Sequence, residues 1–136
     1  MTRQQKVNWL SQYNKINKQY SIVFESYKTH RMRLTSISAQ IITDMPVAHS
    51  ATDKMCEALI ILEELQQKAD AMMLRLRLLK AQIMSVINSV KIDKSKLILT
   101  YRYVNCYDWS TIRNKIGVSP AHLFRLHLQG LDAIKV

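Results

Sequence analysis

The sequence predicts an all-α protein, in which an N-terminal hairpin of two long helices is followed by a C-terminal helix-turn-helix. Glycine and proline number only two each among 136 residues, whereas an all-β fold needs many tight turns, which draw on both residue types. Apolar residues recur at alternating steps of three and four along most of the chain, which is the spacing of one helical face. Because 48% of the residues are hydrophobic, these faces can build a substantial core.

The first helix is predicted over residues 4–35, where one apolar face precedes a polar break. We expect this face to be buried in the protein's own fold; it consists of Trp9, Tyr13, Ile16, Tyr20, Val23 and Tyr27. Ser, Thr and Asp then accumulate, and the residue before Pro46 is pushed out of helical geometry. These features predict a loop near residues 44–52, with a short helical turn around residues 37–42 before it.

The second helix is predicted to begin at Thr52 or Asp53, either of which is a good N-cap, and to end near Val90. Its heptad seam consists of Ala58, Leu62, Leu65, Ala69, Met72, Leu76, Leu79, Ile83, Val86 and Val90. The apolar face is widened by Leu59, Met73, Leu74, Leu78 and Ile87. A wide face indicates packing against the first helix and also favours contact with a second subunit. A helix of ~38 residues is ~57 Å long, which makes dimerisation plausible.

The segment after residue 91 divides into three predicted helices, at residues 93–104, 109–116 and 120–134. Asp93 or Ser95 can cap the first, and Asp108 can cap the second. The first is broken by Asn-Cys-Tyr at 105–107, and Trp109 is expected to anchor the start of the second.

The second and third of these helices form the predicted helix-turn-helix. Gly117 stands where the first must stop, in the left-handed conformation that glycine readily takes. Val118 can plug the angle between the helices, Ser119 is a good N-cap, and Pro120 suits the first helical position. Gly130 allows close helix contact. The inner faces are apolar and consist of Ile112, Ile116, Leu123, Leu126, Leu131 and Ile134.

The outward residues of the last helix are Ala121, His122, Phe124, Arg125, Gln129 and Asp132. A recognition helix places its N-terminal side chains on base edges, where Arg125 can form a bidentate pair with guanine and His122 can donate or accept a hydrogen bond. Ser119 and the free N–H groups beside it suit a phosphate, whereas Arg113 and Lys115 suit the flanking backbone. The candidate DNA-binding set is therefore Ser119, Pro120, Ala121, His122, Phe124, Arg125, Gln129, Arg113 and Lys115.

The charge of the chain favours an anionic partner. The formal net charge is +10 and the pI is about 9.8, which suits nucleic acid first and a membrane surface second. Residues 1–43 carry +6, residues 44–90 carry −1 and residues 91–136 carry +5, so two separate basic surfaces can meet phosphate. We expect a helical hairpin and oligomerisation region over residues 1–90, and a DNA-binding domain over residues 91–136.

No enzyme activity, cofactor or metal site is expected. Cys56 and Cys106 are too few and too far apart for a disulfide framework, and neither has zinc-ligand spacing with a histidine. No pattern of nucleophile, base and orienting group is visible. The N-terminus lacks the apolar core of a signal peptide, and no run of ~18 apolar residues exists. A cytoplasmic protein with no membrane span is therefore expected.

Residues 97–134, LILTYRYVNCYDWSTIRNKIGVSPAHLFRLHLQGLDAI, resemble the region-4-like helix-turn-helix of sigma-70-type factors. They are more similar still to the RinA/ArpU-type transcription regulators of phages and mobile elements of Gram-positive bacteria. Residues 35–55, TSISAQIITDMPVAHSATDKM, are similar to the linker of such proteins, with matches at 44–46 and 53–55. The resemblance implies a small cytoplasmic regulator that binds a promoter and activates late phage genes.

The resemblance also implies which residues touch bases, namely those just after the turn: Pro120, Ala121, Phe124 and Arg125. The region-4 pattern usually has polar or charged residues at most of these places, and Pro120, Ala121 and Phe124 depart from it. Base reading through hydrogen bonds is thereby reduced, and Phe124 is left to contact thymine methyl groups or a protein.

Three functions fit these features. The first is a sequence-specific transcription regulator, expected to be an activator, which binds double-stranded DNA as a homo-oligomer, with a dimer favoured. The second is a DNA-packaging protein of the small-terminase type, in which the DNA-binding unit usually comes first, whereas here it comes last. The third is a region-4 mimic that binds bacterial RNA polymerase without reading DNA, and the net charge of +10 argues against it. We therefore expect the first function.

Overall fold

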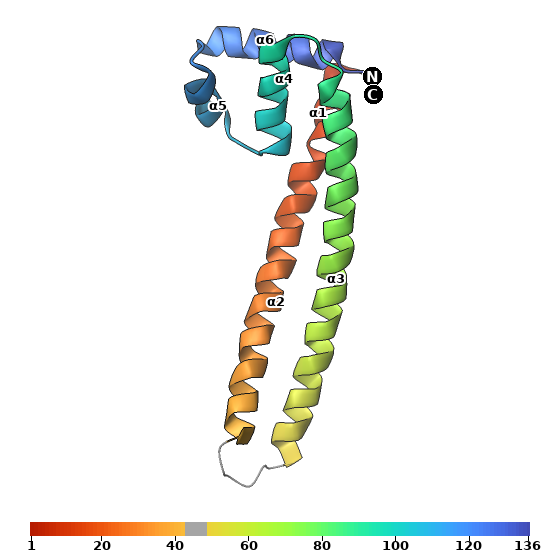
Figure 1. Ribbon diagram of the computed structural model, residues 1–136, viewed down its shortest axis with the longest axis vertical. Helices are drawn as coiled ribbons and strands as arrows, with labels where there is room; N and C mark the ends of the chain where they lie inside the picture. Colours follow the sequence, from red (N-terminus) through yellow and green to blue (C-terminus); the bar gives the residue numbers. More distant parts are fainter. Residues whose placement is uncertain (43–48) are drawn as a thin grey trace. The chain divides into compact units, whose positions relative to one another are not determined.

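The computed structural model describes residues 1–42 and 49–136, and within these ranges the protein is all-α (Figure 1). The elements are α1 (Arg3–Leu10), α2 (Gln12–Ile42), α3 (His49–Asn88), α4 (Asp93–Leu99), the π-helical turn η1 (Thr100–Val104), α5 (Trp109–Ile116) and α6 (Pro120–Ala133). α1 and α2 form one bent helix, α2 and α3 form a hairpin, and the shorter helices follow. The predicted fold class is confirmed.

Two compact units make up the chain. The terminal unit contains residues 1–17 and 75–136, and the hairpin unit contains residues 18–74. The terminal unit is therefore discontinuous, because the hairpin unit is inserted between its two stretches. The division into domains at residues 1–90 and 91–136 stays a prediction, since compactness alone does not tell which part folds independently.

The hairpin unit is held by the apolar faces that the sequence predicts. Tyr20, Phe24 and Tyr27 of α2 line a shallow hollow together with Gln66, Ala69 and Asp70 of α3. His30 and Ile37, further along α2, lie beside residues 54–61 of α3, so the two helices run antiparallel. Ring stacking joins consecutive turns of α2, with centroids 5.7 Å apart for Tyr20 and Phe24. Among the described residues of this unit, the buried apolar side chains are Val23, Ala58 and Ala69.

Both long helices extend further than predicted around the chain reversal. α2 does not stop near residue 35 but continues to Ile42, and the Thr35 hydroxyl donates to the Arg31 carbonyl oxygen (3.0 Å) within the helix. α3 begins at His49, so neither Thr52 nor Asp53 is its N-cap. The residues before them, His-Ser-Ala, contain no helix breaker. Of the loop predicted at 44–52, residues 44–48 lie outside the described residues.

The terminal unit has buried apolar side chains from α1, α3, α4, α5 and α6. Its completely buried apolar side chains are Leu10, Ile83, Ile87, Ile98, Leu99, Ile112, Leu131 and Ile134. α4 crosses α6 closely at Gly130, as predicted. A Cβ at Gly130 would lie 3.0 Å from Leu99 Cδ1 and 3.3 Å from Ser95 Cβ. The buried Ser95 hydroxyl donates to the Leu126 carbonyl oxygen at 2.8 Å, which ties the two helices together.

The first of the shorter helices starts and ends differently from the prediction. Ile92 occupies the N-cap with extended backbone, and no side chain caps α4; Asp93 is the first helical residue, and Ser95 is used inside the core. The helix then widens into η1, where the Asn105 amide donates to the Thr100 carbonyl. The break predicted at 105–107 is confirmed, since Cys106 has φ +59°, a conformation that is uncommon outside glycine.

Candidate nucleic-acid interface

The turn between α5 and α6 has the local geometry that its residues predict. Asp108 caps α5 and accepts from the Thr111 amide at 2.8 Å; hydrogen bonds from Thr111 lower the pKa of the Asp108 carboxyl. Gly117 ends α5 with φ +74° and ψ +38°. Ser119 then caps α6, its hydroxyl accepting from the His122 amide at 3.3 Å, with Pro120 at the first helical position. Two helices joined by a three-residue turn are thus confirmed.

An apolar cluster fixes the angle between α5 and α6. Its buried members are Ile98, Ile112, Leu123 and Leu126. Partly buried side chains pack around them, and these include the predicted plug Val118 and also Tyr101, Tyr107 and Ile116. Because the cluster joins three helices, the outer surface of α6 has a fixed position on the terminal unit.

The structure leaves nearly all of the candidate DNA-binding residues in solvent. The exposed ones are Arg113, Lys115, Ser119, Pro120, Ala121, Phe124, Arg125 and Gln129. His122 is half-buried, so it is less available than the sequence indicates. Arg113 lies beside Pro120 and Phe124, so α5 contributes a cation to the N-terminal part of α6. The Lys115 ammonium lies over the Tyr107 ring, 5.3 Å from its centroid.

A buried histidine supports the start of α5. His127 is 7% exposed, and its Nε2 lies 2.8 Å from the Tyr103 hydroxyl oxygen. Burial, together with the positive charge of Arg102, lowers the pKa of His127 to about 4, whereas burial raises the pKa of Tyr103 to about 12. Both groups are therefore neutral near pH 7, and the imidazole accepts a hydrogen bond from the phenol hydroxyl, so His127 is a structural residue.

Trp109 rests on this histidine. The Trp109 ring meets the His127 ring edge-on, with centroids 4.8 Å apart, and the Arg102 guanidinium lies over the Trp109 ring, 4.7 Å from its centroid. The predicted anchoring role of Trp109 agrees with these contacts. The indole is nevertheless 36% exposed, so it both supports α5 and contributes to the surface.

An open apolar groove lies between α5 and the N-terminal half of α6. Its volume is about 260 Å³, and its lining consists of Trp109, Ser110, Arg113, Pro120, Leu123, Phe124 and His127. Leu123 and His127 are buried beneath it, whereas Phe124 is 63% exposed. The sequence does not predict this groove, because it depends on how the two helices cross.

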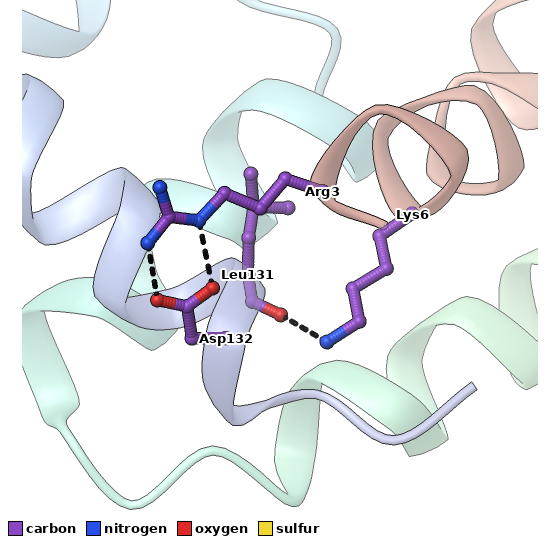
Figure 2. Close-up of polar contacts among 4 residues, drawn as sticks. All are labelled: Arg3, Lys6, Leu131 and Asp132. Carbon is purple, nitrogen blue, oxygen red and sulfur yellow. Dashed lines mark hydrogen bonds and ion pairs between the residues drawn. The ribbon is translucent and has the colours of Figure 1, made fainter. Parts of the chain in front are cut away.

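The N-terminal helix is attached to the end of α6 (Figure 2). Arg3 pairs with Asp132 through two hydrogen bonds, of 2.8 Å from Nε and 2.7 Å from Nη2, and the bond lowers the pKa of the Asp132 carboxyl. Lys6 Nζ donates to the Leu131 carbonyl oxygen at 2.8 Å. A capping box between Thr2 and Gln5 fixes the first turn of α1. The negative charge of Asp132, an outward residue of α6, is thus balanced by Arg3, which lies 129 residues earlier in the sequence.

The positive charge is concentrated in the terminal unit. Residues 1–17 and 75–136 contain 14 Lys/Arg and three Asp/Glu, a net charge of +11, whereas residues 18–74 contain six and seven, a net charge of −1. The basic residues at the start of the chain, Arg3 and Lys6, therefore belong to the same compact unit as α5 and α6, and the two separate basic surfaces stay a prediction.

Within residues 1–42 and 49–136, no His, Cys, Asp and Glu side chains gather in a group of three or more that could hold a metal ion. In the same part of the chain, no helix combines the length and apolar character needed to cross a membrane. No protein-family model, curated protein or solved structure matches the chain. Its function is therefore inferred from the geometry and charge of the terminal unit.

Proposed function

We propose that the protein is a sequence-specific DNA-binding transcription regulator. The observation that carries this proposal is the net charge of +11 on the compact unit that contains the α5–turn–α6 pair. A strongly basic unit with an outward helix is the electrostatic and steric arrangement that double-stranded DNA requires. The resemblance to RinA/ArpU-type regulators adds the finer proposal of a cytoplasmic activator of late genes in a phage or mobile element of Gram-positive bacteria.

In this proposal α6 enters the major groove by its N-terminal half. Arg125 is exposed on α6 and pairs with a guanine edge through two hydrogen bonds. The exposed Arg113 and Lys115 of α5 hold the flanking phosphates, as positioning contacts that carry no sequence information. The Ser119 end of α6 faces a further phosphate. Because His122 is half-buried, it is a minor reader of the sequence.

The protein acts as a homodimer in this proposal, and the hairpin unit supplies the support for it. Several large apolar side chains of that unit are more than half exposed, namely Ile22, Met32, Ile60 and Leu74. A second subunit covers such side chains favourably, and a dimer places two recognition helices on half-sites separated by whole turns of DNA.

Bacterial RNA polymerase is the alternative partner. The observation that favours it is the apolar groove beside Phe124, because an exposed aromatic residue over such a groove is typical of protein-binding surfaces. In that case the α5–turn–α6 pair is a region-4 mimic that grips polymerase, and the protein does not read bases. The salt dependence of DNA binding distinguishes the two functions.

The test is binding to a late-promoter fragment and to a scrambled duplex of equal length, measured by fluorescence anisotropy across a salt series. We expect a preference of about tenfold or more for the promoter near physiological salt. Arg125→Ala should reduce affinity for the promoter by about 1–3 kcal/mol and relax specificity at one position, whereas Arg113→Ala should weaken binding to both duplexes alike.

Lys68→Ala is the matched control, because Lys68 is an exposed cation of the hairpin unit and its loss should leave binding unchanged. Equal binding to both duplexes that vanishes as salt rises would contradict sequence-specific regulation. Tight binding to purified RNA polymerase, together with such unspecific DNA binding, would favour the mimic.

A further inference from the structure

The N-terminal half of α6 presents an apolar surface where a recognition helix usually presents hydrogen-bonding groups. Pro120, Ala121 and Phe124 are all exposed, and none has a side chain that can donate or accept a hydrogen bond. Phe124 is 63% exposed, although the apolar cluster beneath it is complete without it. The fold therefore does not require an aromatic side chain at this position.

The same surface continues into the groove between α5 and α6. Trp109 and Pro120 line the groove with Phe124, and Leu123 lies beneath them. Its volume is about 260 Å³, which is larger than the volume of one methyl group. Only the Arg113 guanidinium among its lining residues carries a full positive charge, because the low pKa of His127 keeps its imidazole neutral near pH 7.

The charge around the groove indicates what occupies it. Arg113 lines the groove, the exposed Arg125 follows Phe124 on α6, and the terminal unit carries +11 in total. An occupant that combines negative charge with a small apolar projection matches this lining. In the major groove of DNA this combination is provided by thymine, whose C5 methyl group projects beside the phosphate backbone.

We propose that Phe124, with Trp109 and Pro120, receives thymine methyl groups in the major groove, so that the preferred DNA site contains thymine opposite Phe124. This inference rests on the proposed function, because it assigns the base that the same interface reads. Arg125 then supplies the hydrogen-bonded part of recognition, and the groove supplies the apolar part. Pro120, Ala121 and Phe124 depart from the polar residues of the region-4 pattern, and in this proposal the departure changes which base the helix recognises.

The test begins with selection of the preferred site from a random pool of duplexes. The selected duplex is then resynthesised with each thymine replaced in turn by deoxyuridine, which lacks only the C5 methyl group. We expect one or two of these single replacements each to weaken binding of the wild-type protein about three- to fivefold, as follows from removing one buried methyl group. Replacements elsewhere should have no effect.

Phe124→Ala is expected to bind the thymine and the deoxyuridine duplex equally, because the side chain that contacts the methyl group is gone. Leu97→Ala is the matched control: Leu97 is also an exposed apolar residue of the terminal unit, 41% exposed on α4, and does not line the groove. It should retain the full response to deoxyuridine. Circular dichroism melting of both variants verifies that they are folded.

The outcomes separate this inference from the proposed function. If the wild-type protein selects no site and binds all duplexes alike, the proposed function fails. If it selects a site but no deoxyuridine replacement weakens binding, the function stands and the inference is overturned. The inference is also overturned if Phe124→Ala still responds to the methyl group, or if it abolishes binding to RNA polymerase while DNA binding is unchanged, because the groove is then a protein-docking site.

Discussion

The stability of the terminal unit should depend on pH through His127. The folded-state pKa of this imidazole is lowered to about 4, whereas the ordinary value in an unfolded chain is about 6.5. Between these two values the unfolded chain binds a proton that the folded chain does not, so stability is fully present above pH 6.5 and is lost as the pH falls. From the two values, the loss between about pH 7 and about pH 5 is about 2 kcal/mol.

The measurement is the free energy of unfolding from urea titrations at about pH 7 and about pH 5. In this pH interval the effect of His127 is separated from the effects of Asp108 and Asp132, because the lowered pKa values of these two carboxyls change stability only in more acidic solution. His127→Gln is the control variant, since the glutamine amide can still meet the Tyr103 hydroxyl without titrating. We expect this variant to lose most of the pH dependence.

An equally large loss of stability in the wild-type protein and in His127→Gln would refute the reasoning, because the titrating group would then lie elsewhere. No loss in the wild-type protein would show that the imidazole is hydrated and titrates normally in the folded state. Either result would also remove the assignment of His127 as a neutral hydrogen-bond acceptor.

Three further predictions concern the terminal unit. Ser95→Ala should lower the free energy of unfolding by about 1 kcal/mol, measured by urea titration, because the buried hydrogen bond to the Leu126 carbonyl is lost; no change would mean that the bond contributes nothing. Gly130→Val should cost about 2–3 kcal/mol or more, because even one added carbon lies 3.0 Å from a neighbouring side chain; unchanged melting would show that α4 can move aside. Asp132→Asn should strengthen DNA binding about two- to fivefold, and Arg3→Ala should weaken it by a similar factor, because each variant removes one charge of the exposed ion pair. The measurement is a fluorescence anisotropy titration of each variant with DNA. Equal losses of affinity in both variants would mean that the pair has a structural role instead.

The local parts of the fold could be predicted from the sequence because short-range chemistry decides them. Asp108, Gly117 and Ser119 each act within four residues of themselves, as caps or as a left-handed stop, so their roles are visible in the sequence. The inner faces of α5 and α6 follow from the helical period in the same way. The buried Ile112, with its neighbours on α6, confirms that reading.

The features that the sequence did not predict all depend on contacts between distant residues. Serine is a favourable N-cap residue, but the Ser95 hydroxyl donates instead to the Leu126 carbonyl oxygen of α6. Tertiary packing therefore overrides the local preference. The pair of Arg3 and Asp132 joins residues that no pattern connects. The groove beside Phe124 depends on the crossing of two helices, so only the structure shows that the exposed aromatic residue has a concave neighbour.

The discontinuous terminal unit has a consequence for the entropy of closing the chain. Its α1 must meet α6 across the intervening residues 18–74, and the entropy lost in closing a loop grows with the length of that loop. The antiparallel helices of the hairpin unit bring its own two ends together, since Tyr20 near one end and Asp70 near the other line the same hollow. In the folded protein the long connection therefore has the effective length of a short one, and less entropy is lost when α1 packs against α6.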